Sequence, residues 1–284
     1  MAAPFCVRAP HKPGMEGWRQ SRQAGRLMHP LKHRAMLAFL FALCVALLPA
    51  TARAECIRGD FPIAVDIGHT PEDPGAVSAR GIPEFAFNIA LGRDAAAALG
   101  GAGFPAPRIL VSGKGKEQLS RRVSAARALS PALVVSIHHD SVQERYLEDW
   151  QFAGRGGRYS DRFAGFSIFV SRASPHFQES LAFATALGRS LTSAGLTPSM
   201  HHAETIPGEN RAILDRRHGV FEFRNLRVLK DAAAPAILLE AGIIVNRQEE
   251  IELASPARRK LVAGAIVEAV TAMCAGRGSA LVLR

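Results

Sequence analysis

Long hydrophobic runs are nearly absent from this 284-residue chain. The apolar run over residues 35–48 has about 14 residues, whereas a helix that spans a membrane needs ~20. Basic residues precede the run, and an Ala-Arg-Ala site at 52–54 follows it. This is the pattern of a cleaved secretory signal peptide and argues against a permanent membrane anchor.

The leader defined in this way covers residues 1–54, and the mature chain covers residues 55–284. The 27 residues before Met28 are long for the basic segment of a signal peptide, so Met28 is an alternative start. We expect export to the periplasm or another extracytoplasmic compartment.

Tyrosine and tryptophan are also scarce, with two of each in the whole chain. The net charge of +10 is concentrated in the leader, where eight Lys and Arg face one acid, so that +3 remains for the mature chain. A nucleic-acid-binding protein would need a basic surface in the folded domain. The sequence therefore argues against a nucleic-acid partner.

Only two cysteines, Cys56 and Cys274, remain after cleavage, one near each end of the mature chain. In an oxidising compartment two such thiols can pair. Two separately buried thiols are the alternative. We predict a single disulfide between them.

No repeat and no Ser- or Pro-rich linker divides the mature chain, so we expect one domain. Apolar runs typical of strands alternate with helical patterns, which predicts an α/β fold with helices on both faces of a sheet. The strands are predicted at 63–67, 109–111, 133–137, 165–170 and 236–239, the helices at 84–99, 117–129, 180–194 and 256–274, and polar surface loops at 144–163 and 197–224.

Three predicted strands run into a residue that could carry chemistry: His69, His138 and Glu240. In open α/β sheets, ligands bind outside the carboxyl ends of the strands. The two imidazoles and the carboxylate therefore predict a metal or acid–base site at one edge. A catalytic zinc typically takes three protein ligands, and Glu84, which opens the helix after the first strand, is a candidate for the third.

Each of these residues has a purely structural alternative. Glu84 could simply complement the dipole of its helix, and His69, next to Gly68, could be a turn residue. His138 and His139 are adjacent on a strand, so only one of them can face the site. Glu240 is harder to explain structurally, because burying an unpaired carboxylate is costly.

Three further histidines, His201, His202 and His218, lie in one of the polar segments. They suggest a second metal site, but solvated loop histidines are the favoured interpretation.

The chain also carries four motif blocks in a defined order. They are Gly68-His69, Asp73-Pro74-Gly75-Ala76 and Glu84; Leu119, Arg122 and Ala126; Ser136-Ile137-His138; and Pro235, Leu239-Glu240, Gly242, Asn246, Glu249-Glu250 and Leu253. Spread over residues 61–270, these blocks resemble the zinc-dependent N-acetylmuramoyl-L-alanine amidases of the amidase-3 type, which are cell-wall hydrolases.

The resemblance implies a mixed, mostly parallel sheet in a single three-layer domain. It implies that His69, Glu84 and His138 bind Zn²⁺, which selects His138 over His139, and that Glu240 is the catalytic carboxylate. The implied substrate is peptidoglycan, cleaved between N-acetylmuramic acid and the L-alanine of the stem peptide.

Two other functions stay open at this point. A zinc carboxypeptidase acting on stem peptides would use similar ligands, although its motifs fit less well. A wall-binding relative without catalysis would be expected to lack a ligand or Glu240, and none is missing.

Some relatives carry a long helical insertion that plugs the zinc. The interval after Val170 contains one ordinary helix and a loop, so no plug is predicted, and no protein activator can be named.

Overall fold

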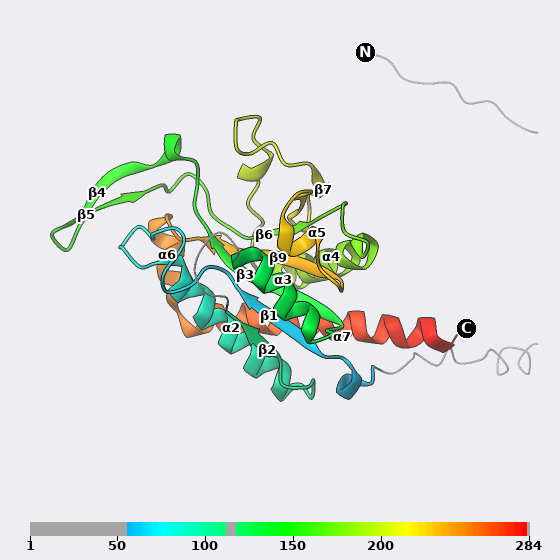
Figure 1. Ribbon diagram of the computed structural model, residues 1–284. Coiled ribbons are helices and arrows are strands. Elements are labelled where there is room, and N and C mark those ends of the chain that lie inside the picture. Colours follow the sequence, from blue (N-terminus) through cyan, green and yellow to red (C-terminus); the bar gives the residue numbers. More distant parts are fainter. Residues whose placement is uncertain (1–55, 112–117, 283–284) are drawn as a thin grey trace, which may run out of the picture. The chain divides into compact units, whose positions relative to one another are not determined.

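A mixed sheet of seven strands, ordered β2-β1-β3-β9-β6-β8-β7, forms the centre of the molecule in a computed structural model (Figure 1). The structure describes residues 56–111 and 118–282, so the predicted signal peptide lies outside the described residues. The strands are β1 Ile63–Ile67, β2 Arg108–Leu110, β3 Leu133–Asp140, β4 Glu148–Phe152, β5 Arg155–Tyr159, β6 Ser167–Val170, β7 Ile213–Asp215, β8 Val220–Glu222 and β9 Ala236–Ile243. The helices are α2 Glu84–Gly101, α3 Gln118–Ala128, α4 Phe177–Ser193, α5 Arg227–Lys230, α6 Arg247–Ala254 and α7 Pro256–Val282, with short 3₁₀ turns η1 Arg58–Asp60, η2 Glu144–Tyr146 and η3 His201–Ala203.

The direction of the strands confirms the mixed, mostly parallel sheet. β1 is parallel to β2 and β3, and β3 is parallel to β9. β6 runs antiparallel to β9 and parallel to β8, and β7 is antiparallel to β8. Because β1, β3 and β9 are parallel to one another, their carboxyl ends share one edge of the sheet.

Two apolar cores cover the two faces of the sheet, as predicted. On one face, alternate residues of β1 such as Val65 pack with α2, α4 and α7, and this core is the larger. On the other face, Ala64 belongs to a second core with Val134 and Leu238, beneath α3 and α5. Burial on both faces explains why the central strands are almost continuously apolar.

β3 and β9 are longer than predicted. They were expected to end at Ile137 and Leu239, but the parallel ladder between them continues and pairs His138 with Glu240. The backbone N–H and C=O groups of the two strands continue to hydrogen-bond to each other past the first polar side chain. The two residues therefore lie inside neighbouring strands instead of following them.

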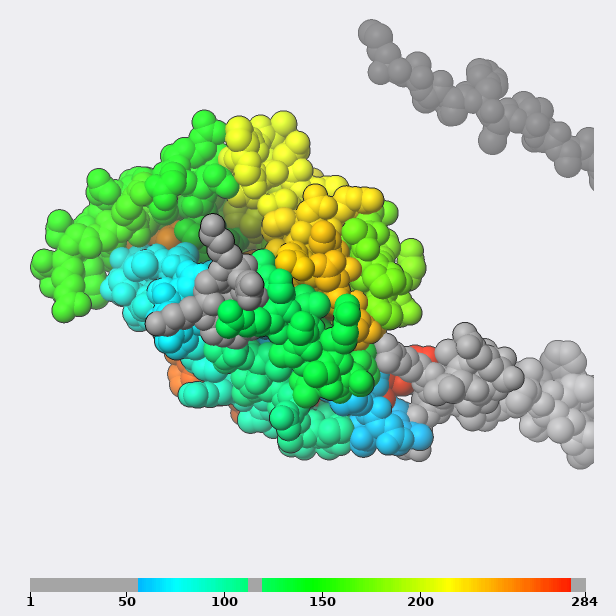
Figure 2. Space-filling view, in the orientation of Figure 1, coloured from blue at the N-terminus to red at the C-terminus, as the bar shows by residue number. Residues whose placement is uncertain are grey.

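The expectation of a polar loop over 144–163 is wrong in part, because β4 and β5 form a two-stranded hairpin. Its turn places both Ala153 and Gly154 at positive φ, 49° and 75°, which matches the right-handed twist of a two-residue hairpin. The Trp150 indole donates to the carbonyl of Ala79 at 2.8 Å, joining the hairpin to the turn after β1. In Figure 2 the hairpin (green) projects from the body beside that turn (cyan).

The other polar segment, 197–224, is also more ordered than predicted. β7 and β8 lie within it and complete the sheet at one edge. Both strands have only three residues, too short for an alternating pattern to mark them in the sequence.

The predicted disulfide between Cys56 and Cys274 is confirmed, with a Cα–Cα distance of 5.0 Å. It ties the start of the described chain to α7, which packs against the larger core. Across the residues that the structure describes, every helix is too short or too polar to span a membrane.

Candidate metal centre

His69 occupies the turn after β1 in a left-handed backbone conformation, with φ of 64°. Histidine is one of the few side chains tolerated there, at some cost in free energy. The buried Arg122 of α3 holds this turn in place. Its guanidinium donates to the carbonyl oxygen of His69 at 2.5 Å and also to that of Ile67, and it pairs with Asp66 of β1 at 2.8 Å.

Glu84 is the first residue of α2, after Pro83, whose fixed φ suits a helix start. Its side chain is buried, and several N–H groups bind its carboxylate. The backbone N–H of Ala76 donates to Oε2 at 3.2 Å, and the amide of Asn88 donates to Oε1 at 3.0 Å. Asn88 lies one turn further along α2 and also donates to the carbonyl of Gly68. The carboxylate is therefore fixed in position.

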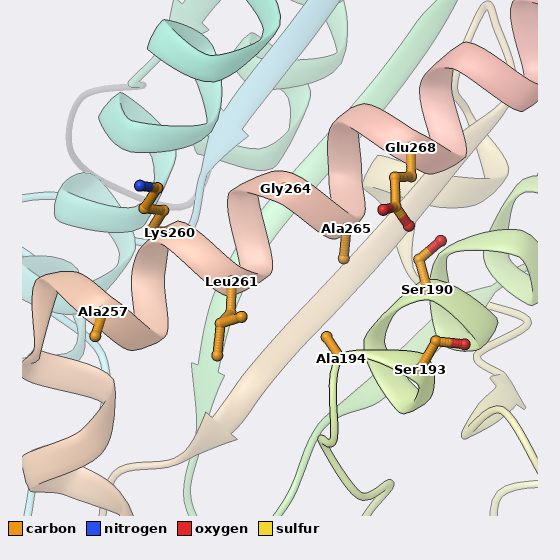
Figure 3. Close-up of a pocket in the computed structure, with 9 residues that line it drawn as sticks. All are labelled: Ser190, Ser193, Ala194, Ala257, Lys260, Leu261, Gly264, Ala265 and Glu268. Carbon is orange, nitrogen blue, oxygen red and sulfur yellow. The ribbon is translucent and has the colours of Figure 1, made fainter.

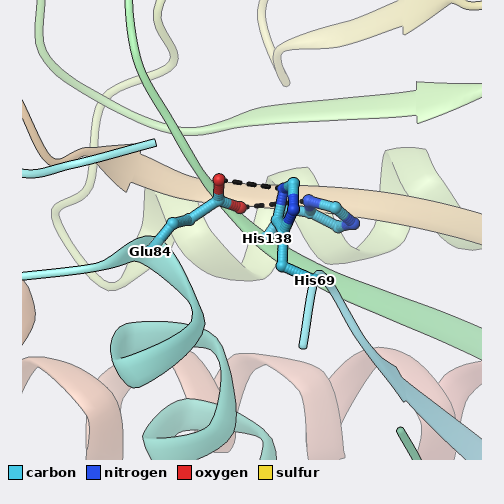
Figure 4. Close-up of side chains that lie close together, drawn as sticks. All are labelled: His69, Glu84 and His138. Carbon is cyan, nitrogen blue, oxygen red and sulfur yellow. Dashed lines mark hydrogen bonds and ion pairs between the residues drawn. The ribbon is translucent and has the colours of Figure 1, made fainter. Parts of the chain in front are cut away.

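The structure brings His69, Glu84 and His138 together (Figure 4). Oε2 of Glu84 lies 3.0 Å from Nε2 of His69, and Oε1 lies 3.1 Å from Nδ1 of His138. Burial raises the pKa of Glu84, but the two histidines outweigh it and hold the pKa well below its usual range. Burial alone would lower the pKa of His69, but the Glu84 carboxylate outweighs burial and raises the pKa above its usual value.

The donor set suits a zinc ion, because imidazole nitrogens and one carboxylate oxygen are typical ligands of a catalytic zinc. The three potential ligand atoms lie within 4.8 Å of one another. Space for the cluster depends on two glycines. A Cβ on Gly75 would collide with Glu84 and His69, and a Cβ on Gly68 would lie 2.5 Å from the ring of His138.

His139 points to the opposite side of β3, as expected from strand geometry. It is buried, and its Nδ1 lies 2.8 Å from the side-chain oxygen of Asn88. Burial lowers the pKa of His139 to about 3, so this ring is neutral. It supports Asn88, which in turn orients Glu84.

Glu240 lies on β9 directly beside His138 of β3 and opposite Ser167 of β6. Its Oε2 atom is buried and has no hydrogen-bond partner within the described part of the chain. Burial, together with the negative charges of Asp140 and Glu84, raises the pKa of Glu240 well above its normal value. A carboxyl with a raised pKa is suited to exchange protons near neutral pH.

The remaining residues of the last motif block support this site. Asn246 caps α6 by accepting from the N–H groups of residues 248 and 249. The buried Glu249 accepts from the N–H groups of Gly165 and Ile243, which fixes the end of β9. Glu250 binds Ser78 at 2.6 Å and Arg80 at 2.7 Å, so it anchors the turn that leads into Glu84.

The expectation that His201 and His202 are solvated loop residues is wrong. Their exposed fractions are 3% and 8%, and both rings face the carboxylate of Asp140, two residues after His138. His218 lies apart from them, half-buried, with its Nδ1 2.7 Å from Asp215. Burial alone would lower the pKa of His202, but the carboxylates of Asp140 and Glu209 raise it to about 9.

A cavity of about 250 Å³ joins the two clusters, with His138 and Glu240 on one part of its wall and Asp140 and His202 on another. A second cavity, of about 610 Å³, lies between α4 and α7 (Figure 3). Its lining consists mostly of small side chains such as Ala194 and Gly264, and it shares no residue with either histidine cluster. The candidate site residues therefore line the smaller cavity and not the larger one.

Residues 63–272 match the model of the N-acetylmuramoyl-L-alanine amidase family, which is most of the chain. The chain belongs to this family. A probable N-acetylmuramoyl-L-alanine amidase, AmiB, of Haemophilus influenzae is 24% identical over 240 residues. The match covers 78% of this chain and 54% of AmiB, so the chain spans about half the length of that relative.

Solved structures of amidases share the fold. The N-acetylmuramyl-L-alanine amidase Ami1 of Mycobacterium smegmatis is 20% identical with a TM-score of 0.57, over 77% of this chain and 99% of Ami1. The catalytic domain of CwlV, an amidase from Paenibacillus polymyxa, is 25% identical with a TM-score of 0.53, over 75% and 97% of the two chains.

Proposed function

We propose that this protein hydrolyses peptidoglycan at the amide between N-acetylmuramic acid and the L-alanine of the stem peptide, and that it uses one Zn²⁺ ion held by His69, Glu84 and His138. Membership of the amidase family supports the bond and the substrate. The observation that carries the chemistry is the convergence of three zinc-type ligands beside Glu240, whose Oε2 has no hydrogen-bond partner among the described residues.

A zinc ion bound there would polarise the scissile carbonyl and lower the pKa of water. The residues of the chain would supply proton transfer and the positioning of the ligands. Glu240 would take a proton from the attacking water and pass it to the leaving nitrogen, and its register with His138 supports this role. Asn88 and the backbone N–H of Ala76 hold Glu84, and Arg122 holds the turn of His69, so that both side chains are positioned before substrate binds.

We also propose that the protein is exported and that the leader, residues 1–54, is removed. The signal-peptide pattern supports this, and so does the disulfide between Cys56 and Cys274, because such bonds persist in oxidising compartments. N-terminal sequencing of the exported protein tests it, with Glu55 as the expected first residue. A retained apolar segment would contradict it.

Digestion of purified sacculi with mass analysis of the products tests the proposed reaction. Release of whole stem peptides that begin with L-alanine, together with glycan strands free of peptide, is the expected result. Release of single amino acids or shortened stem peptides would instead identify a carboxypeptidase. Binding to sacculi without any product would indicate an inactive wall-binding protein.

A further inference from the structure

A second cluster of metal-ligating side chains lies outside the site described above. It consists of Asp140 at the end of β3 and of His201 and His202 in η3. Oδ2 of Asp140 lies 2.9 Å from Nε2 of His201 and 2.8 Å from Nε2 of His202. Segments far apart in the sequence therefore converge on one carboxylate oxygen.

The approach of these three atoms is not explained by hydrogen bonds. Although they are close, all three are buried without hydrogen-bond geometry to any described partner. The opposite nitrogen of His202, Nδ1, lies 2.8 Å from Oε2 of Glu209. Since an ionised carboxylate can only accept, Nδ1 of His202 carries the proton. When a metal ion displaces the second proton of the ring, Nε2 presents its lone pair on the side of Asp140.

The outer contacts of the cluster are those that orient metal ligands. A histidine that binds a metal typically donates its other N–H to a carboxylate or similar acceptor, as His202 does to Glu209. Nδ1 of His201 lies 2.8 Å from the Ser199 hydroxyl, and Oδ1 of Asp140 accepts from the backbone N–H of Ser141 at 2.8 Å. Each of the three side chains is thus held in orientation by a contact at the atom that faces away from the cluster.

The surroundings favour a bound cation over two charged rings. The centroids of His201 and His202 are 3.8 Å apart, and Phe163 and Phe169 pack against them. Two imidazolium ions at that separation in an apolar setting would repel each other strongly. A divalent ion between two neutral rings and one carboxylate satisfies all three groups, and the cavity shared with Glu240 gives it a route of entry.

We propose that Asp140, His201 and His202 form a second site for a divalent transition-metal ion of the Zn²⁺ class. Two imidazoles and one carboxylate are the ligand types that such ions prefer. The inference does not depend on the proposed hydrolytic function, because the site shares no ligand with His69, Glu84 and His138.

Zinc stoichiometry separates the two sites. After removal of metal with a chelator under non-reducing conditions, the mature protein is titrated with Zn²⁺ by calorimetry, and bound metal is counted by mass spectrometry. The wild type is expected to bind two equivalents. The double variant His69→Ala/Glu84→Ala isolates the second site and is expected to bind one, and adding His202→Ala to it should abolish that binding.

Two single variants refine the test. Glu209→Gln should retain the second ion with an affinity weakened about 10–100-fold, as expected for loss of an orienting partner. His218→Ala is the matched control, because His218 pairs with Asp215 outside the cluster, and it should bind two equivalents like the wild type. Circular dichroism of each metal-free variant confirms that it is folded.

One equivalent in the wild type together with none in the folded double variant would overturn the second site, and it would show that the cluster holds only protons. If instead the double variant kept one equivalent after His202→Ala was added, the ion would lie elsewhere and the assignment would be wrong. Failure of the proposed hydrolytic function would appear separately, as absence of peptide release from sacculi.

Discussion

At the scale of single residues, position 75 requires glycine, because Glu84 and His69 occupy the space that a Cβ would need. A Cβ at this position would collide with Oε2 of Glu84 and lie 2.6 Å from Cδ2 of His69. We expect Gly75→Ala to displace one of these ligands and to weaken zinc binding at least ~10-fold, measured by competition with a chromogenic chelator.

Gly81→Ala is the matched control for that variant. Gly81 lies in the same turn region at φ of +89°, close to the +77° of Gly75, but an added Cβ would meet no atom within 4 Å. Both variants carry a backbone penalty of ~1–2 kcal/mol. Equal zinc affinity in the two would contradict a steric role for Gly75.

Arg122 is a second single residue on which the site depends. Its guanidinium is buried against Asp66 and the carbonyl of His69. Arg122→Met would leave Asp66 as an uncompensated buried charge, so we expect the free energy of unfolding to fall by ~3–5 kcal/mol in urea denaturation. Arg127→Met, on the exposed side of the same helix, should change it by less than ~0.5 kcal/mol. Similar effects from both would refute a buried ion pair.

The sequence predicted single residues well where strand geometry decides their position. His69, His138 and Glu240 were placed at one edge because each follows an apolar run. Alternation predicted that only one of His138 and His139 faces the site, and the family resemblance selected His138. His201 and His202 were misassigned, because their burial depends on a carboxylate from β3 and on aromatic rings that no local pattern reveals.

At the scale of elements, α6 depends on Asn246. Its side chain accepts from the N–H groups of residues 248 and 249 and donates to the carbonyl of Phe163 at 3.0 Å. Asn246→Ala should lower the free energy of unfolding by ~1 kcal/mol, within the range of lost helix caps. Asn246→Asp keeps the capping oxygen and should recover most of the loss. No recovery in chemical denaturation would mean that the bond to Phe163 matters more than the cap.

Elements marked by an apolar run or a helical pattern were predicted closely, and elements without such a pattern were missed. β1 begins and ends where its apolar run does. The β4–β5 hairpin was missed because its residues are mostly exposed and present no buried apolar face; instead, cations stack on its aromatics, such as Arg247 over Tyr159 at 3.8 Å. β7 and β8 are strands of three residues each; β8 pairs with β6, and β7 pairs with β8 and forms the edge of the sheet.

At the scale of the whole molecule, the disulfide closes almost the entire described chain. Cys56 and Cys274 are separated by 218 positions. Chain-entropy arguments favour cross-links that close long loops, and native disulfides typically contribute ~2–4 kcal/mol. Cys56→Ser/Cys274→Ser should lower the free energy of unfolding by that amount in guanidinium denaturation. An unchanged midpoint, with and without reductant, would contradict a stabilising role.

The account as a whole depends on Glu240 as the proton-transferring group beside a separate set of zinc ligands. Glu240→Gln keeps the size of the side chain and removes its basic oxygen, so zinc content and melting temperature should match those of the wild type. Glu179→Gln, on the exposed surface of α4, is the matched control and should retain full activity.

Release of stem peptides from purified sacculi by Glu240→Gln, with zinc counted in the same samples, is the most direct measurement. We predict the full zinc content and a rate at least ~10²-fold below that of the wild type, as is typical when a general acid–base group is lost. A rate close to that of the wild type would contradict the proposed mechanism. Loss of zinc from the variant would instead make Glu240 a ligand.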